Sequence, residues 1–135
     1  MGRTRLVLAV GLVATLALVG CNMGRRSPSG FRLPPGDADA GKAAFVELKC
    51  HTCHSVDGTD LPAPTAPRVI ALGGGRVLPQ TDGDITTDII LPSSHFAADF
   101  PAGATSPMPD YTRTMTVRQL SDLVAFLQSK YRVGL

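Results

Sequence analysis

The hydrophobic and polar positions divide the chain into an apolar run near the start, a polar spacer and a longer region with helical periodicity. Leu6 to Val19 is an apolar run with one polar residue, Thr15, too short to span a bilayer comfortably but of the length found in export signals. Residues 22–36 are rich in Gly, Pro, Ser and Arg without apolar periodicity, which predicts a flexible tether. Residues 37–135, about 100 in number, suffice for one small domain.

The domain is predicted to begin with a helix from near Asp37 to Cys50. Asp37 is a good N-cap, and the negative charge of Asp39 in the first turn suits the helix dipole. Gly41 inside this helix costs about 1 kcal/mol relative to Ala, which makes sense if another helix crosses closely there. Phe45, one turn further on, would then lie beside that crossing.

The last helix of the domain has the clearest signals. Thr116 to Gln119 forms a capping box, and Met115 just before it can pack on Leu120. An apolar stripe at spacings of three and four follows, made by Leu120, Leu123, Val124 and Leu127. We expect this helix to cross the first one at Gly41.

Between these two helices the pattern predicts shorter elements. A short helical turn is expected over 68–72, and Asp82-Gly83 suggests a turn or short hairpin. A brief helix should run from Asp84, its N-cap, to Leu91, where Pro92 stops it. The long loop that follows, up to residue 115, is of a length that is usually functional.

The strongest chemical motif is Cys50-His-Thr-Cys53-His54. This C-x-x-C-H run is typical of covalent c-type haem attachment. The two cysteines can form thioethers with the vinyl groups of one porphyrin edge, and the histidine that follows can turn under the ring and bind iron. In the brief helix, Ile85 and Ile89 would face the haem, with Ile90 as a further candidate.

Other readings of this motif stay open. A thioredoxin-like redox pair would want a βαβ pattern around it, which is absent. A zinc site would need a distant fourth ligand such as His95, because no cysteine follows Cys53. A disulfide across so short a loop would leave the adjacent His54 unexplained.

The start of the chain predicts export and lipidation. Arg3 and Arg5 precede the apolar run, which ends in Leu-Val-Gly before Cys21, an arrangement that resembles a bacterial lipobox. We therefore expect residues 1–20 to be a lipoprotein signal peptide and residues 21–36 to be a lipidated cysteine with its tether. Two of the three cysteines then go to haem and one to lipid, and both assignments place the protein outside the cytoplasmic membrane.

The charge of the domain differs from that of the whole chain. The formal net charge is +2, but from Gly36 onward eight Lys or Arg stand against eleven Asp or Glu, about −3. Nucleic-acid binding therefore has no support. An acidic face could steer encounter with a basic patch on a partner protein.

Haem iron in an electron carrier needs a sixth ligand, and a Met thioether gives a raised potential. Met23 lies in the tether, and Met115 is accounted for by the start of the last helix. Met108 stands between two prolines, which stiffen the backbone and would hold a weak ligand in place. His95 in the same long loop is the rival ligand.

These features together resemble the class I c-type cytochromes. The resemblance rests on Gly41-Lys-x-x-Phe45 before the haem motif, on Met108-Pro-x-Tyr111, and on the final apolar helix, and it covers most of residues 37–131. A similarity to the cytochrome c domains of CuA-type oxidase subunits rests on Ile85 to Pro92, on Met108-Pro109 and on Leu120 to Leu127.

The resemblance implies a small all-α class I cytochrome c fold. Three to five helices would wrap around one covalent haem c, with the first and last helices crossing. His54 and Met108 would be the axial ligands, and the carbonyl of Pro67 would support the histidine. Since the chain has no Trp, contacts to the haem propionates would come from Arg76 or Tyr111.

By the same resemblance the protein would be an electron carrier rather than an enzyme, without a small-molecule substrate. A quinol-oxidising complex would be the donor, and a terminal oxidase or N-oxide reductase the acceptor. A fixed haem subunit of a larger oxidoreductase complex is the alternative. A haem enzyme or gas sensor, in which the sixth coordination position of the iron stays open, is a further alternative.

Overall fold

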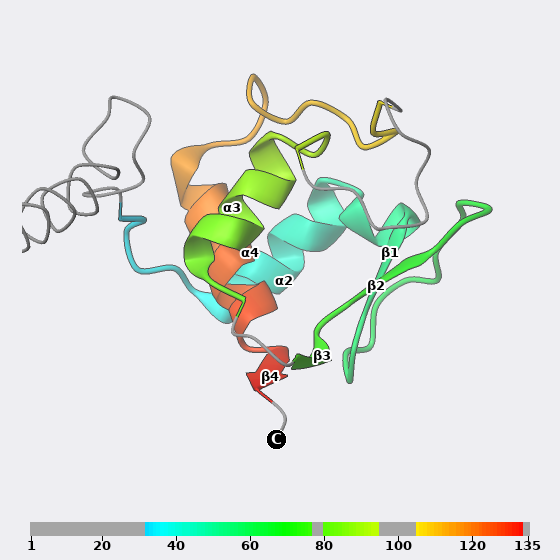
Figure 1. Cartoon of the computed structure of the whole chain (residues 1–135), viewed down its shortest axis with the longest axis horizontal. Helices are drawn as coiled ribbons and strands as arrows, with labels where there is room; N and C mark the ends of the chain where they lie inside the picture. The colour runs from blue at the N-terminus through cyan, green and yellow to red at the C-terminus, as the bar shows by residue number, and fades with distance from the viewer. Residues whose placement is uncertain (1–31, 77–79, 95–104, 134–135) are drawn as a thin grey trace, which may run out of the picture. The chain divides into compact units, whose positions relative to one another are not determined.

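The computed structural model describes residues 32–76, 80–94 and 105–133 (Figure 1). The fold described below is that of the unit Leu33–Leu135. The predicted signal peptide, Cys21, most of the tether and His95 lie outside the described residues. No helix within the described ranges is long and apolar enough to cross a membrane.

Helix α2 (Ala38–Glu47) begins where the sequence predicts. The carboxylate of Asp37 accepts hydrogen bonds from the backbone N–H groups of Asp39 and Ala40, at 2.9 and 2.8 Å. The helix ends earlier than expected, because Leu48 is its C-cap and Lys49 takes a left-handed conformation with φ of 60°. A 3-10 turn, η1 (Cys50–Thr52), follows directly.

Helix α4 (Val117–Gln128) confirms both its predicted cap and its predicted crossing with α2. The side chains of Thr116 and Gln119 each accept the backbone N–H of the other, at 3.1 and 3.0 Å. At Gly41 the two backbones come so close that a Cβ would overlap the carbonyl oxygen of Asp122. The rings of Phe45 and Phe126 meet edge to face beside this point, with centroids 5.7 Å apart.

Helix α3 (Asp82–Ile90) begins two residues before the predicted start, with Thr81 rather than Asp84 as its N-cap. Asp84 instead completes a capping box, since its carboxylate accepts the Thr81 N–H at 2.9 Å while the Thr81 hydroxyl accepts the Asp84 N–H at 3.1 Å. The turn or short hairpin expected at Asp82-Gly83 is wrong: both residues belong to the first turn of α3, and Gly83 does not have the positive φ that a tight hairpin turn requires.

Four short strands are the part of the fold that the sequence did not predict. Strand β1 (His54–Val56) pairs in parallel with β2 (Ile70–Leu72), and β3 (Gly74–Arg76) pairs in parallel with β4 (Tyr131–Val133). The helical turn expected over 68–72 is therefore wrong. Parallel pairing joins segments far apart in the chain, so a local pattern of three residues does not reveal it.

The core lies where α4 packs against α2 and α3 (Figure 1). Ile85 and Ile89 point into it, whereas Ile90 is 38% exposed and does not face the interior. The buried apolar side chains are Ala44, Phe45, Val56, Ile85, Ile89, Leu123, Val124, Phe126 and Leu127. The described domain is thus mostly helical, with three α-helices and short strands, in agreement with the expected small helical fold.

Candidate functional site

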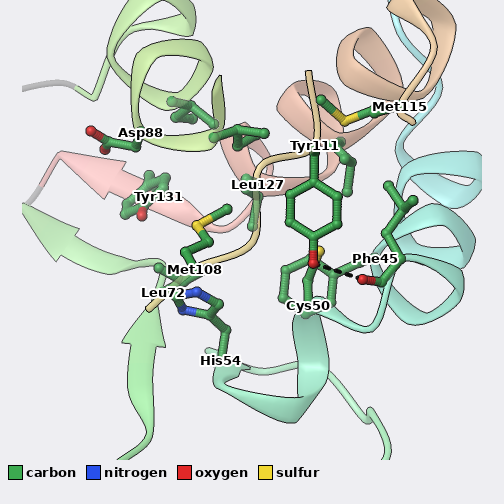
Figure 2. Close-up of a pocket in the computed structure, with 14 residues that line it drawn as sticks. Phe45, Cys50, His54, Leu72, Asp88, Met108, Tyr111, Met115, Leu127 and Tyr131 are labelled. Atoms are coloured by element: carbon green, nitrogen blue, oxygen red, sulfur yellow. Dashed lines mark hydrogen bonds between the residues drawn. The ribbon is translucent and has the colours of Figure 1, made fainter. Parts of the chain in front are cut away.

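An apolar pocket opens beside the core and brings together residues from the three α-helices, from strands β1, β2 and β4, and from the segment before α4 (Figure 2). About 600 Å³ of space free of protein atoms lies in it, counting its open side. Apolar side chains from α2, α3 and α4 form its walls. Cys50, His54 and Met108, which the sequence singled out from distant stretches, all line it.

The C-x-x-C-H segment is held by backbone hydrogen bonds from the loop that follows it. The carbonyl of Thr52 accepts the N–H groups of Thr65 and Ala66, at 3.0 and 2.9 Å. The carbonyl of Cys53 accepts the N–H of Ile70 at 3.0 Å, where β1 and β2 meet. The turn places the Cys50 side chain in the pocket wall and leaves Cys53 exposed, which would put one sulfur inside the site and one at its edge.

The His54 imidazole is a suitable ligand for a metal. Burial lowers the pKa of His54 below its usual value, and the backbone of Ile70 raises it by a smaller amount. The ring is therefore neutral at neutral pH, the form that coordinates iron. Its Nδ1 is buried without a hydrogen-bond partner, so the support by Pro67, which is itself exposed, stays a prediction.

The environment of Cys50 does not favour redox chemistry of the thiol. Burial raises the pKa of Cys50 to about 11, while a backbone hydrogen bond and the nearby Tyr111 hydroxyl lower it by less. A reactive cysteine has a lowered pKa, because the thiolate is the nucleophile. The pocket therefore disfavours a thioredoxin-like pair, one of the readings that the sequence left open.

Two methionines line the pocket from the segment before α4. Met108 and Met115 are both half-buried and pack against the core cluster. In Figure 2 the Met108 thioether points away from the His54 imidazole, toward the side of the pocket with Tyr131 and Leu127, whereas Met115 lies near Tyr111 and the start of α4. The position of Met115 agrees with the prediction that this residue packs at the start of the last helix.

Among the lining residues that the sequence did not point to are Leu72, Asp88 and Tyr131. Leu72 and Tyr131 stand on β2 and β4, and those strands had no local signal. The guanidinium of Arg76 lies 5.4 Å from the ring centroid of Tyr131. Arg76, named above for a propionate contact, thus stands next to a residue of the pocket wall.

A comparison with protein-family models identifies the family to which the chain belongs. The model for cytochrome c matches residues 38–130. The chain belongs to the cytochrome c family. Comparisons with curated proteins and with solved structures found no match.

Membership in the cytochrome c family establishes the cofactor and the general role. Cytochrome c domains bind covalently attached haem c, one in a domain with a single attachment motif, and this chain has one such motif. The protein is therefore an electron-transfer haem protein with redox proteins as partners, and members of the family are generally carriers rather than enzymes.

The residues present fit haem c. The walls of the pocket are largely apolar, the imidazole is neutral, and two thiols stand at the spacing that the porphyrin edge requires. Within the described ranges, no group of three or more His, Cys, Asp or Glu residues could hold a bare metal ion.

Proposed function

We propose that this protein is a lipid-anchored monohaem cytochrome c that passes single electrons between respiratory complexes outside a bacterial cytoplasmic membrane. Haem c supplies a one-electron ferric/ferrous couple when bound. Cys50 and Cys53 provide the thioether attachments, and His54 and Met108 provide the axial ligands. The donor is a quinol-oxidising complex, and the acceptor is a terminal oxidase or N-oxide reductase.

One observation carries the carrier assignment: Met108 shares the pocket with His54. A thioether in the sixth position leaves iron without a free site for a substrate, which suits electron transfer and raises the reduction potential. An enzyme or gas sensor would instead need that position open. The surrounding apolar walls exclude water from the ring, which favours the less charged ferrous state.

The anchor is proposed from the sequence of residues 1–36. The basic start, the apolar run and Cys21 suit a lipoprotein signal, and the tether that follows would let the domain swing between complexes. The similarity to domains of CuA-type oxidases favours an oxidase as acceptor. A fixed subunit of one larger oxidoreductase is the second candidate, favoured by the same similarity.

The axial ligands are tested by the near-infrared spectrum of the oxidised, haem-loaded domain. We expect a sulfur-to-iron charge-transfer band that is lost in Met108→Ala and kept in Met115→Ala. Met115 is the matched control because it lines the same pocket and is also half-buried. If the band is absent from the unmutated protein, or persists in Met108→Ala, the carrier with this ligand pair is refuted.

The anchor and the partner need the full-length chain in its native membrane. We expect the unmutated protein in the membrane fraction. Cys21→Ala cannot be lipidated, so we expect it either in the soluble fraction or at the mass of the precursor with its signal peptide uncleaved. Stable co-purification with an oxidase after mild detergent extraction would favour the fixed subunit, whereas recovery as a separate protein would favour the shuttle.

A further inference from the structure

Tyr111 forms a hydrogen bond between the methionine-bearing segment and the end of α2. Its phenol donates to the carbonyl oxygen of Leu48 at 2.9 Å, across 63 positions in the chain (Figure 2). Leu48 is the C-cap of α2 and lies two residues before Cys50. The bond therefore joins the segment that carries Met108 to the segment that begins the haem motif.

We propose that Tyr111 is a positioning residue whose hydroxyl keeps the Met108 segment closed over the pocket. The inference rests on the proposed ligation of iron by Met108 and adds the residue that maintains it. Tyr111 lies three residues after Met108, so the backbone between them has little freedom once the phenol is bound.

The backbone of Tyr111 is fixed on its other side as well. Its carbonyl accepts the N–H groups of Thr114 and Met115, at 3.1 and 2.9 Å, which ties it to the approach to α4. The side chain is half-buried and lines the pocket. Tyr111 is thus the point at which the segment is attached both to the start of α4 and to the end of α2.

Two hydrogen bonds lie on the other side of Met108. The N–H of Ser106 donates to the Ser93 hydroxyl at 3.1 Å, and the N–H of Met108 donates to the Ser106 hydroxyl at 3.2 Å. The Ser106–Ser93 bond is exposed to solvent, where water competes with it. The Met108–Ser106 bond is part-buried but stays within the segment, so the part-buried Tyr111 bond is the stronger of the two side-chain ties between the segment and the rest of the domain.

Opening of the segment is measurable, because an external ligand can take the place of the thioether. Imidazole binds iron only in molecules in which Met108 has left, so its apparent affinity reports the population of the open form. The net worth of one hydrogen bond predicts an increase of about 3- to 10-fold in that population when the hydroxyl is removed.

The test is an imidazole titration of the oxidised, haem-loaded domain, following the charge-transfer band. Tyr111→Phe keeps the ring and removes the donor. Thr112→Val is the matched control, because it removes a hydroxyl that bonds only within the segment, to the carboxylate of Asp110 at 2.6 Å. We expect the band in both variants without imidazole, and an apparent imidazole Kd lowered about 3- to 10-fold in Tyr111→Phe alone.

The outcomes separate this inference from the proposal on which it rests. If unmutated protein has the Met108-dependent band but Tyr111→Phe binds imidazole like the unmutated protein, only the positioning role is overturned. A drop in denaturant stability without a change in imidazole Kd also overturns it, since that indicates a structural role alone. Absence of the band from unmutated protein overturns the Met108 ligation and this inference together.

Discussion

Replacement of Gly41 by alanine tests the helix crossing on which the pocket is built. By helix propensity alone, Ala should stabilise α2 by about 1 kcal/mol. The tertiary structure predicts the opposite sign. A Cβ at this position would overlap the carbonyl oxygen of Asp122 and lie 2.7 Å from the Cβ of Phe126, closer than real Cβ atoms approach.

The size of the effect follows from what would have to move. The first obstacle is backbone, which cannot rotate away like the tip of a side chain, so α2 and α4 must separate. Separation also disturbs the contact between Phe45 and Phe126. Overpacking of this kind costs typically about 1–3 kcal/mol, and a backbone clash belongs at the upper end. After the gain in propensity, we expect Gly41→Ala to be about 2 kcal/mol less stable.

The assay is guanidinium denaturation of the haem-loaded domain, followed by far-ultraviolet circular dichroism. Gly83→Ala in α3 is the matched control, because its Cβ would meet nothing closer than the Thr81 hydroxyl at 3.7 Å. We expect that variant to match the unmutated domain or to exceed it by about 0.4–1 kcal/mol. A Gly41→Ala domain as stable as the unmutated one would show that the helices do not cross at this distance.

Three further substitutions separate a buried polar contact from an exposed one. The carboxylate of Asp122, a residue only 6% exposed, accepts the backbone N–H of Asp37 at 2.8 Å; Asp122→Ala should cost on the order of 1–3 kcal/mol, while Asp122→Asn, which keeps an acceptor, should cost less. Arg132 and Asp57 form an ion pair at 2.9 Å, but their side chains are 75% and 51% exposed. Arg132→Ala should therefore change the denaturation free energy by less than about 1 kcal/mol, and a larger loss would mean that the pair is more than a surface contact.

Local signals in the sequence sufficed for the parts of the fold whose physics is local. The cap at Asp37, the capping box at Thr116 and the apolar stripe of α4 depend on neighbours within one or two turns, so residue order alone predicts them. The predicted start of α3 is wrong because Thr81 and Asp84 are both good N-cap residues. Only the reciprocal hydrogen bonds between them show that Thr81 is the N-cap and Asp84 the third residue of the helix.

Residue order alone predicts the haem motif, the two framing helices and their crossing at Gly41. Each depends on residue types at fixed short spacings, or on a glycine whose cost needs a reason. The parallel pairing of β1 with β2 and of β3 with β4 is visible only in the folded domain, and so are the places of Leu72 and Tyr131 in the pocket wall. The same holds for the bond from Tyr111 to Leu48. These contacts join distant segments, and their energy appears only when the chain brings both partners together.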